Sequence, residues 1–358
     1  NSKLNLNKLF RRRKSMQENK ALFDKAKKVH EENFGNEVAF ERAIFFSWGC
    51  SIGDCTFCYM SAQPLGKNPQ ETRRSIESIL AEFVLAKNLG WDIGFFTGGI
   101  GAFSPDEIEF LIKAASEIAG EKLWLSVGPV AKHFLKKYSP YIRGVVGSTE
   151  TINPELHNII CPSKPLAPYE RMFIDAKDLG LDCAMTFIVG LGEKREDLDL
   201  LKLFIQKYHI NKIHIYGIIP QKGTMFEHVL IPSAEEQAWW IAQLRIAFPK
   251  LDIQCGIWED RTERIPLFLS VGANSISKFP AAKLFGLKQA QDIEAQVKIA
   301  GKTIRGTLTK IPEIDWDSEV DKLSLDIGLK EKIKEKLKNE YIKRMKNNIQ
   351  KDSIISIK

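Results

Sequence analysis

The feature that most constrains the fold is an alternation of short apolar runs with longer amphipathic segments. The apolar runs are typical of β-strands and the amphipathic segments of helices. The expected strands cover residues 43–48, 92–99, 123–128, 144–149, 183–190, 212–219, 251–257 and 272–276. The expected helices cover residues 71–89, 105–119, 168–179, 195–208 and 234–247. Apolar strands joined by helical crossovers predict a parallel sheet that is buried on both faces.

Eight strand and helix units over about 240 residues are what an α/β barrel of the TIM type, (βα)8, requires. An open doubly wound α/β sheet is the alternative, because a change of one strand in the count would alter the architecture. We expect a helical N-terminal extension (1–36), the barrel (37–300) and a lysine-rich helical C-terminal extension (301–358).

Composition narrows the class of protein. The chain has 358 residues, of which 44% are apolar, and a net charge of +7 that is concentrated at its ends. Basic ends are typical of solvated helices and indicate an acidic partner or nucleic acid only weakly. No signal peptide and no run of roughly 20 apolar residues is recognisable, so we expect a cytoplasmic chain without a membrane partner. In that setting six cysteines indicate metal binding or catalysis rather than disulfides.

Three of the cysteines stand within nine residues, in the stretch FFSWGCSIGDCTFCYMS, as Cys50, Cys55 and Cys58. They follow the first expected strand, so they belong to the barrel face on which active sites lie. Three thiolates on a short loop can hold three corners of a 4Fe-4S cluster and leave the fourth iron open. A structural zinc site is the alternative, but no fourth ligand stands nearby in the sequence.

This loop resembles the cluster motif of the radical S-adenosylmethionine (SAM) enzymes, C-x3-C-x2-C, in which an aromatic residue precedes the last cysteine. Phe57 has that place here, and the first gap is one residue longer. The resemblance implies a 4Fe-4S cluster that binds SAM through its open iron, and a reduced ferredoxin or flavodoxin as electron donor. It further implies that SAM is cleaved to a 5'-deoxyadenosyl radical that abstracts hydrogen from an unactivated carbon.

Further motifs are similar to those of the biotin-synthase-like group, and the resemblance covers about residues 22–290. It implies that glycines in FTGG admit the SAM amino group, and that a carboxylate in STETINPELHNII binds the ribose with two supporting hydroxyls. An arginine in PYERMFIDAKDLGLD would bind the SAM carboxylate, and TFIVGLGEKREDL would pack on adenine, with Thr186 in place of the first glycine of that pattern. The implied SAM contacts are Phe57, Gly98, Gly99, Glu150 with Ser148 and Thr151, Arg171, Ile188 and Gly190.

The three remaining cysteines, Cys161, Cys183 and Cys255, could hold a second 4Fe-4S cluster. Biotin synthase has such a cluster, but Phe96 and Trp124 occupy two of its ligand positions here, so biotin formation is not expected. If Ile188 faces SAM, the alternation of the strand turns Cys183 outward. A buried core cysteine is therefore the simpler interpretation for Cys183.

Two reaction classes follow from these cysteines. If they hold a cluster, the resemblance points to archaeal lipoyl synthases, which insert sulfur into an octanoyl chain on a carrier or peptide. The partner would then be a lipoyl carrier domain or a second synthase component. If they do not, the chain resembles the single-cluster maturases of hydrogenase cofactors, which rearrange or fragment a small molecule. A non-catalytic iron-sulfur or zinc module that binds nucleic acid is a third hypothesis.

Four polar residues are candidates for substrate contact. His214 and Tyr216 alternate on the sixth expected strand and could face the barrel interior. Glu259 and Arg261 follow the seventh strand, where an ion pair within the loop would explain them equally well.

Overall fold

The computed structural model describes the backbone of residues 2–64 and 66–355 and the side chains of residues 17–64 and 66–352. Eight strands pair in parallel in the order β2-β3-β4-β5-β6-β7-β8-β1, and β1 pairs with β2 to close the barrel. The strands are β1 (Glu37–Phe45), β2 (Asp92–Thr97), β3 (Leu123–Ser126), β4 (Ile142–Glu150), β5 (Asp182–Val189), β6 (Ile210–Gly217), β7 (Asp252–Gly256) and β8 (Ser275–Ser277). Closure confirms the TIM-type fold and excludes the open sheet.

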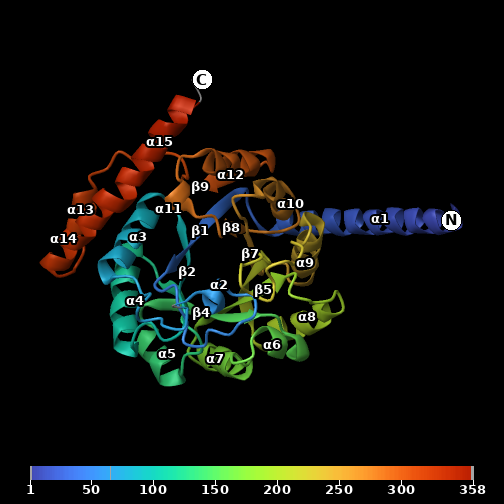
Figure 1. Cartoon of the computed structure of the whole chain (residues 1–358), viewed down its shortest axis with the longest axis horizontal. Coiled ribbons are helices and arrows are strands. Elements are labelled where there is room, and N and C mark those ends of the chain that lie inside the picture. Colours follow the sequence, from blue (N-terminus) through green and yellow to red (C-terminus); the bar gives the residue numbers. More distant parts are fainter. Residues whose placement is uncertain (1, 65, 356–358) are drawn as a thin grey trace.

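Helices surround the strands (Figure 1). They include α3 (Ile76–Asn88), α4 (Pro105–Ala119), α5 (Lys132–Tyr138), α7 (Ala167–Asp178), α8 (Asp197–Lys207), α9 (Ala234–Ala247), α10 (Ile265–Ser270), α11 (Ala281–Leu284) and α12 (Lys288–Ile299). Short helices α2 (Tyr59–Ala62) and α6 (Pro154–Ile160) follow β1 and β4. Helix α4 begins as the sequence predicts, because Ser104 and Glu107 form a reciprocal capping box. Strand β1 covers residues 37–45, whereas the sequence predicted 43–48. It begins six residues earlier and ends three residues earlier, so residues 46–48 belong to the cysteine loop.

Both ends of the chain pack on the outside of the barrel. Helix α1 (Ser2–Asn33) contacts α9 and extends away from the barrel, and the C-terminal helices pack along α3 and α11 (Figure 1). These are α13 (Trp316–Asp321), α14 (Ile327–Lys336), the π-helical segment η2 (Leu337–Ile342) and α15 (Lys343–Ile355). A short strand that the sequence did not predict, β9 (Thr303–Arg305), pairs with β1. The region expected as a helical tail therefore also contains a strand, and the division into three regions stays a prediction.

The barrel interior holds a small apolar cluster of its own, which contains Phe95, Trp124, Val146 and Ala184. Phe95 therefore faces inward, whereas Phe96 packs on Phe46 in the outer core, with 5.0 Å between ring centroids. The expectation that Phe96 lies near a biotin-synthase cluster position is wrong by one residue. Neighbouring residues of a strand point to opposite faces, and the phase of β2 turns Phe95 inward.

A buried polar network closes the amino-terminal end of the barrel. The Lys212 ammonium lies 2.6 Å from Glu41 Oε1 and 2.8 Å from Asp252 Oδ2. Ser275 Oγ and Gln254 Nε2 donate to the two Glu41 oxygens over 2.6 and 2.8 Å. Burial would raise the pKa of Glu41, but the Lys212 charge outweighs it and lowers the pKa to about 2. Glu41 is therefore an ionised and fully compensated carboxylate.

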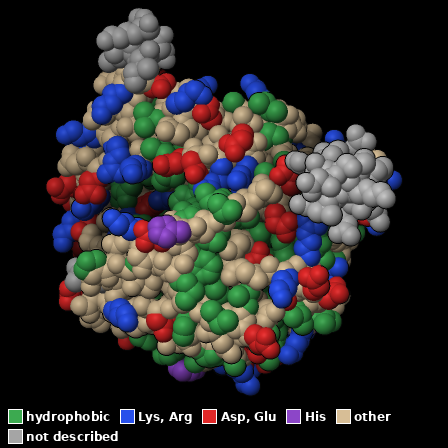
Figure 2. All heavy atoms as spheres, turned by 45° about the vertical axis from the view of Figure 1, so that its right-hand side comes forward, with side chains coloured by type: hydrophobic (Ala, Val, Ile, Leu, Met, Phe, Trp, Pro, Cys, Tyr) green, Lys and Arg blue, Asp and Glu red, His purple; other side chains and the backbone are tan. Residues whose placement is uncertain are grey.

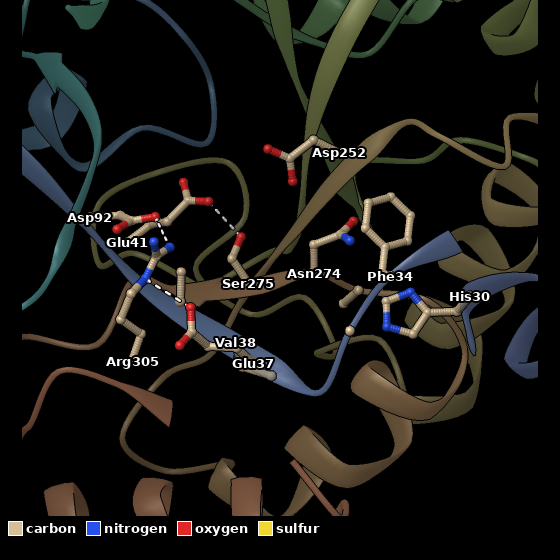
Figure 3. A pocket seen from close by; sticks show the side chains of 13 residues that line it. His30, Phe34, Glu37, Val38, Glu41, Asp92, Asp252, Asn274, Ser275 and Arg305 are labelled. Carbon is tan, nitrogen blue, oxygen red and sulfur yellow. Dashed lines mark hydrogen bonds and ion pairs between the residues drawn. The ribbon is translucent and has the colours of Figure 1, made fainter. Parts of the chain in front are cut away.

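A cavity of about 260 Å³ opens at this same end of the barrel (Figure 3). Arg305 of β9 pairs there with Asp92 over 2.5 Å and with Glu37 over 3.5 Å. His30 and Phe34, at the end of α1, lie together on another wall, with 5.2 Å between their rings (Figure 3). The end of α1, the start of β1 and β9 thus meet at the amino-terminal end of the barrel.

No helix within the described part of the chain is long and apolar enough to span a bilayer.

Candidate active site

The cysteine loop leaves the carboxyl end of β1, as the sequence predicts. Backbone hydrogen bonds fix its first half: Cys50 N donates to Gly66 O over 2.7 Å, and Ser51 N donates to Ile100 O over 2.8 Å. Cys50, Cys55 and Cys58 are free thiols, each partly exposed. Three potential ligands are therefore accessible at the catalytic face of the barrel.

Gly98 and Gly99 bring the loop after β2 directly against the cysteine loop. A Cβ atom at Gly99 would overlap the carbonyl of Gly49, and one at Gly98 would strike the Phe46 ring. Because the two loops meet so closely, Ile100 N can donate to Cys50 Sγ over 3.4 Å. The glycines thus position Cys50, and their contact with the SAM amino group stays a prediction.

Two other segments hold the second half of the cysteine loop. Thr56 donates to Ile160 O through its N–H over 2.8 Å and through its hydroxyl over 3.1 Å. Its own carbonyl accepts from Met225 N over 3.0 Å. Phe57 packs on an apolar cluster at the barrel mouth that contains Ile188 and Tyr216. The loop is thereby clamped between the end of α6 and the segment between β6 and α9.

Three thiols on one loop suit a 4Fe-4S cluster, because each thiolate binds its own iron. A structural zinc site would use a fourth protein ligand. Within the described residues no group of three His, Cys, Asp or Glu side chains that could hold a metal ion is found. Burial raises the pKa of the unbound Cys58 thiol to about 11. Asp54 Oδ1 and the Tyr59 hydroxyl are buried beside the cysteines without a partner, so polar atoms remain available there.

Glu150 ends β4 at the mouth, in the left-handed backbone region with φ of 61°. Lys164 Nζ and Thr186 Oγ1 each donate to its carboxylate over 3.0 Å. Burial would raise the pKa of Glu150, but Lys164 and these hydrogen bonds outweigh it, so the pKa lies below its usual value. Thr186, which replaces a glycine of the family pattern, therefore orients an ionised carboxylate. A strained backbone held in this way is typical of a functional site.

The end of β4 and the residue after it present two hydroxyl groups near Glu150. Ser148 is partly exposed, and the Thr151 hydroxyl is buried without a hydrogen-bond partner. His157 fixes this segment, because its Nδ1 lies 3.0 Å from Thr151 O and its Nε2 lies 2.7 Å from Lys164 O. His157 is buried and both of its ring nitrogens have partners, so it links Thr151 to Lys164 beside Glu150.

The Gly190 turn is shaped by a carboxylate whose role the sequence did not reveal. Gly190 has φ of 102°, and its N–H donates to Glu193 Oε1 over 2.7 Å. The Glu193 carboxylate also accepts from Leu191 N over 2.9 Å and Gly192 N over 3.1 Å. The Glu193 position in the family pattern was the available signal. Ile188, just before this turn, lies at the mouth, where its packing on adenine remains a prediction.

Arg171 does not reach the site, which contradicts its expected role. It is the fifth residue of α7, with 72% of its side chain exposed, and it pairs with Asp175 one turn later over 3.2 Å. The side chain thus lies along the outer surface of its helix, as exposed helix arginines commonly do.

Two lysines that the sequence analysis missed supply positive charge at the mouth. Lys164 is the partner of Glu150, and Lys278 directly follows β8 with φ of 71°. Lys278 Nζ lies 4.4 Å from the Tyr216 ring centroid and near the charges of Glu150 and Cys58. Within the described residues no carboxylate pairs with it, and burial lowers its pKa. Its position at the carboxyl end of a strand was the available signal.

His214 and Tyr216 both lie inside the barrel, as expected. The His214 ring meets Phe95 edge to face with 4.9 Å between centroids, and the Tyr216 hydroxyl donates to Gln254 over 2.9 Å. Burial, assisted by Lys212, lowers the pKa of His214 to about 3, so it is neutral at pH 7. Whether either residue contacts substrate stays a prediction.

The other two substrate candidates differ in exposure. Glu259 is exposed. Arg261 is buried and pairs with its neighbour Asp260 over 2.8 Å, which is the loop ion pair that the sequence left open.

The structure does not bring the three later cysteines together, which corrects the expected second-cluster set. Cys183 Sγ donates to Phe173 O over 3.6 Å and Cys255 Sγ to Ser275 O over 3.5 Å, both in the outer core. Cys161 lies at the barrel mouth instead. Strand alternation is the reason, because the inward residues beside Cys183 and Cys255 are Ala184 and Gln254.

Comparison with known proteins agrees with this geometry. Residues 44–204 match the Radical SAM superfamily. The chain belongs to the radical SAM superfamily. An uncharacterized protein of Methanocaldococcus jannaschii is 38% identical over 80% of both chains. The biotin synthase of Ehrlichia chaffeensis is 25% identical over 69% of this chain and 78% of its own length. This places the radical SAM protein in the biotin-synthase-like group. The crystal structure of methylornithine synthase (PylB) shares its fold, with a TM-score of 0.68 and 21% identity over 80% of this chain and 89% of that one.

Proposed function

We propose that this radical SAM enzyme has a single cluster and generates a radical on a small substrate that carries an anionic group. The observation that supports it is the meeting of the three-cysteine loop, the Glu150 carboxylate and the unpaired Lys278 ammonium at one barrel mouth. When bound, the cluster and SAM supply one-electron bond cleavage and the abstraction of hydrogen from an unactivated carbon.

The residues of the chain have distinct tasks in this proposal. Cys50, Cys55 and Cys58 would hold the 4Fe-4S cluster. Glu150, kept ionised by Lys164, would accept hydrogen bonds from the ribose hydroxyls of SAM, as a carboxylate can. The Thr151 hydroxyl, which has no partner within the protein, is available to the same ligand.

The barrel interior controls what reaches the reacting carbon. Phe95 and Trp124 fill it from β2 and β3 and exclude water from the space beneath the mouth. Lys278 is not paired with a described carboxylate and stands partly buried over Tyr216. An ammonium in such a place is stabilised by an anionic ligand. A carboxylate or phosphate on the substrate would therefore orient it beside the cysteine loop.

Sulfur insertion of the lipoyl-synthase type has less support. It requires a second sulfur source such as an auxiliary cluster. Cys183 and Cys255 lie in the outer core, where each thiol donates to a backbone carbonyl, so they do not face a site for such a cluster. An octanoyl chain would also leave Lys278 without a counter-ion. Without that reaction, a lipoyl carrier domain is not needed as a partner. A reduced ferredoxin or flavodoxin remains the proposed electron donor.

Nucleic-acid binding also has little support. On the face shown in Figure 2, Lys and Arg side chains are interspersed with Asp and Glu side chains instead of forming a basic stripe.

Anaerobic reconstitution with iron and sulfide tests the proposal. We expect about four irons per chain and reductive formation of 5'-deoxyadenosine from SAM. About eight irons, lost on substitution of Cys161 and Cys255, would instead establish the sulfur-insertion mechanism. Absence of SAM cleavage by the iron-loaded chain would refute both reactions.

Lys278→Met tests the substrate class. We expect it to raise the substrate concentration needed for half-maximal turnover by about tenfold or more and to leave SAM affinity unchanged. Lys283→Met, on α11 outside the mouth, is the matched control. An unchanged KM in Lys278→Met would remove the argument for an anionic substrate.

A further inference from the structure

The cavity at the amino-terminal end of the barrel is lined by two walls of different chemistry. Figure 3 shows His30 and Phe34 on one side and Asp92, Glu41 and Arg305 on the other. The cavity measures about 260 Å³. Sites for drug-sized ligands measure roughly 300–1,000 Å³, so this one suits a smaller molecule. The cysteine loop lies at the opposite end of the barrel.

The first wall carries more negative charge than its cations balance. Four carboxylates line the cavity, on Glu37, Glu41, Asp92 and Asp252. Arg305 pairs with both Glu37 and Asp92, and Lys212 is shared between Glu41 and Asp252. Because each cation serves two carboxylates, two negative charges remain uncompensated. Burial raises the pKa of Asp92 to about 6, so its ionised form would gain from a further cation.

The opposite wall offers a hydrogen-bond donor that the protein does not use. His30 is 3% exposed, and its Nε2 lies 3.4 Å from the Lys302 ammonium. Burial, with Lys302 and Arg245, lowers the pKa of His30 to about 3, so the ring is neutral and has one proton. An ammonium can only donate, which places that proton on Nδ1. Within the described part of the chain His30 Nδ1 has no hydrogen-bond partner, although buried polar groups nearly always have one.

Two cations behind His30 are unpaired as well. Arg245 is fully buried, and its guanidinium carbon lies 4.5 Å from the centroid of the Phe34 ring. Its guanidinium donates to backbone carbonyls and to Asn274 Oδ1. Lys302 Nζ donates to Gly35 O over 3.1 Å. Among the described residues no carboxylate forms an ion pair with either cation, so this side of the cavity is positive.

The two walls together select a ligand that has both charges. Buried charges cost free energy unless they are paired. A simple cation would leave the His30 N–H unsatisfied, and a simple anion would be repelled by the carboxylates. The remaining lining includes the small apolar side chains of Val38, Ala39 and Ala273, which suit a short aliphatic group.

We propose that this cavity binds a zwitterionic α-amino acid with a short aliphatic side chain. Its ammonium would pair with the carboxylates, and its carboxylate would accept from the His30 Nδ1–H. His30 belongs to α1, Arg305 to β9 and Asp252 to β7, so the ligand would hold both extensions of the chain against the barrel. The site goes beyond the proposed function and does not depend on it.

Calorimetric titration of the full-length, cluster-free protein with L-alanine at pH 7 tests the site. Propionate, which lacks the ammonium, and ethylamine, which lacks the carboxylate, are the matched control ligands. We expect L-alanine to bind at one site, at least about tenfold more tightly than either control. It should also raise the melting temperature, because it binds the folded state only.

Two variants test the two walls separately. His30→Phe keeps a ring beside Phe34 and removes the donor, so L-alanine should bind at least about tenfold more weakly. Glu37→Gln, at a side chain that is 62% exposed, should weaken L-alanine and ethylamine but not propionate. His133→Phe, at an exposed histidine of α5, is the matched control and should bind L-alanine as the wild type does.

Three results would overturn the inference. Absence of saturable L-alanine binding would leave the cavity to water alone. Equal affinity for L-alanine and one of the control ligands would remove the argument from two opposite charges. Unchanged affinity in both His30→Phe and Glu37→Gln would place the ligand elsewhere. Because the protein carries no cluster in these titrations, such a failure would leave the proposed function untouched.

Discussion

The two ends of the barrel differ in how their polar groups are satisfied. At the amino end, Glu41 is matched by Lys212, Gln254 and Ser275, and no oxygen of its carboxylate lacks a donor. At the carboxyl end, Lys278 has no carboxylate partner among the described residues, and the Thr151 hydroxyl is buried alone. The comparison teaches that the Glu41 network is built for stability, whereas the groups at the carboxyl end retain capacity for a ligand.

Backbone conformation follows the same division. Two of the three non-glycine residues with positive φ within the described chain, Glu150 and Lys278, follow or end strands at the carboxyl end. Such conformations cost on the order of 1–3 kcal/mol each and persist where surrounding contacts impose them.

Removal of a cysteine ligand should have the largest effect, confined to the carboxyl end. We expect Cys58→Ser to lose the cluster and to reduce 5'-deoxyadenosine formation by on the order of 10³-fold or more, since ligands act as a unit. Iron analysis and a cleavage assay measure this. The melting temperature of the apoprotein should stay unchanged. A large drop in it would show that Cys58 also stabilises the fold and would contradict the contrast between the two ends.

Breaking the Glu41 network at the amino end should have the opposite effect and lower the stability of the apoprotein. Lys212→Met leaves the Glu41 carboxylate buried and unpaired, which should lower the free energy of unfolding by about 3–5 kcal/mol. Urea titration of the apoprotein measures it. The double variant Glu41→Gln with Lys212→Met should recover most of the loss. A single-variant loss below about 1 kcal/mol would contradict the assigned role of this network.

Substitution of Glu150, which we propose to bind the SAM ribose, should affect SAM binding more than stability. We expect Glu150→Gln to weaken the binding of SAM by about 10- to 100-fold, because a charge-assisted hydrogen bond contributes roughly 1.5–3 kcal/mol. Equilibrium binding of SAM to the reconstituted protein measures this loss. The binding of 5'-methylthioadenosine, which keeps the ribose, should weaken by the same factor.

Arg171→Met is the matched control for that experiment. It should bind SAM within about twofold of wild type, because Arg171 lies on the outer surface of α7. A strong loss in Arg171→Met would restore the role that the sequence suggested for this residue.

Protonation of His214 at acid pH should lower the free energy of unfolding by a smaller amount. His214 has a folded-state pKa of about 3 against an ordinary value of 6.5, so the unfolded state binds the proton more tightly. Its contribution to stability is complete above about pH 6.5 and falls progressively as pH drops toward 3. At pH 5 the loss is on the order of 2 kcal/mol. We expect His214→Phe to flatten this pH dependence in urea titrations, and an unchanged slope would refute the assignment.

Much of the architecture could be predicted because it repeats locally. Each strand of the barrel appears in the sequence as an apolar run, and Cys50, Cys55 and Cys58 follow the first of them. Outward placement of Cys183 also followed from strand alternation, and its hydrogen bond to Phe173 O agrees. Alternation identifies opposite faces, but it does not fix the phase by itself, so Phe96 was assigned inward in place of Phe95.

The errors at the site have a common cause. Arg171 matched a family position, yet the direction of its side chain depends on the packing of α7. Lys164 and Lys278 carry no local pattern. The His157 contacts fold the loop after β4 so that Lys164 meets Glu150, and barrel closure brings Lys278 to the same mouth. Strand β9 has just three residues, too few for a periodic signal, and is stabilised by pairing with β1.

The sequence by itself determined the barrel, the family and the three-cysteine loop, because hydrophobic periodicity and ligand spacing are encoded between near neighbours. The tertiary structure decided which later groups meet that loop. It separated Cys183 and Cys255 from Cys161 and left Lys278 unpaired at the mouth. These outcomes depend on contacts between residues far apart in the chain, whose directions are set only when the strands close and the helices pack around them.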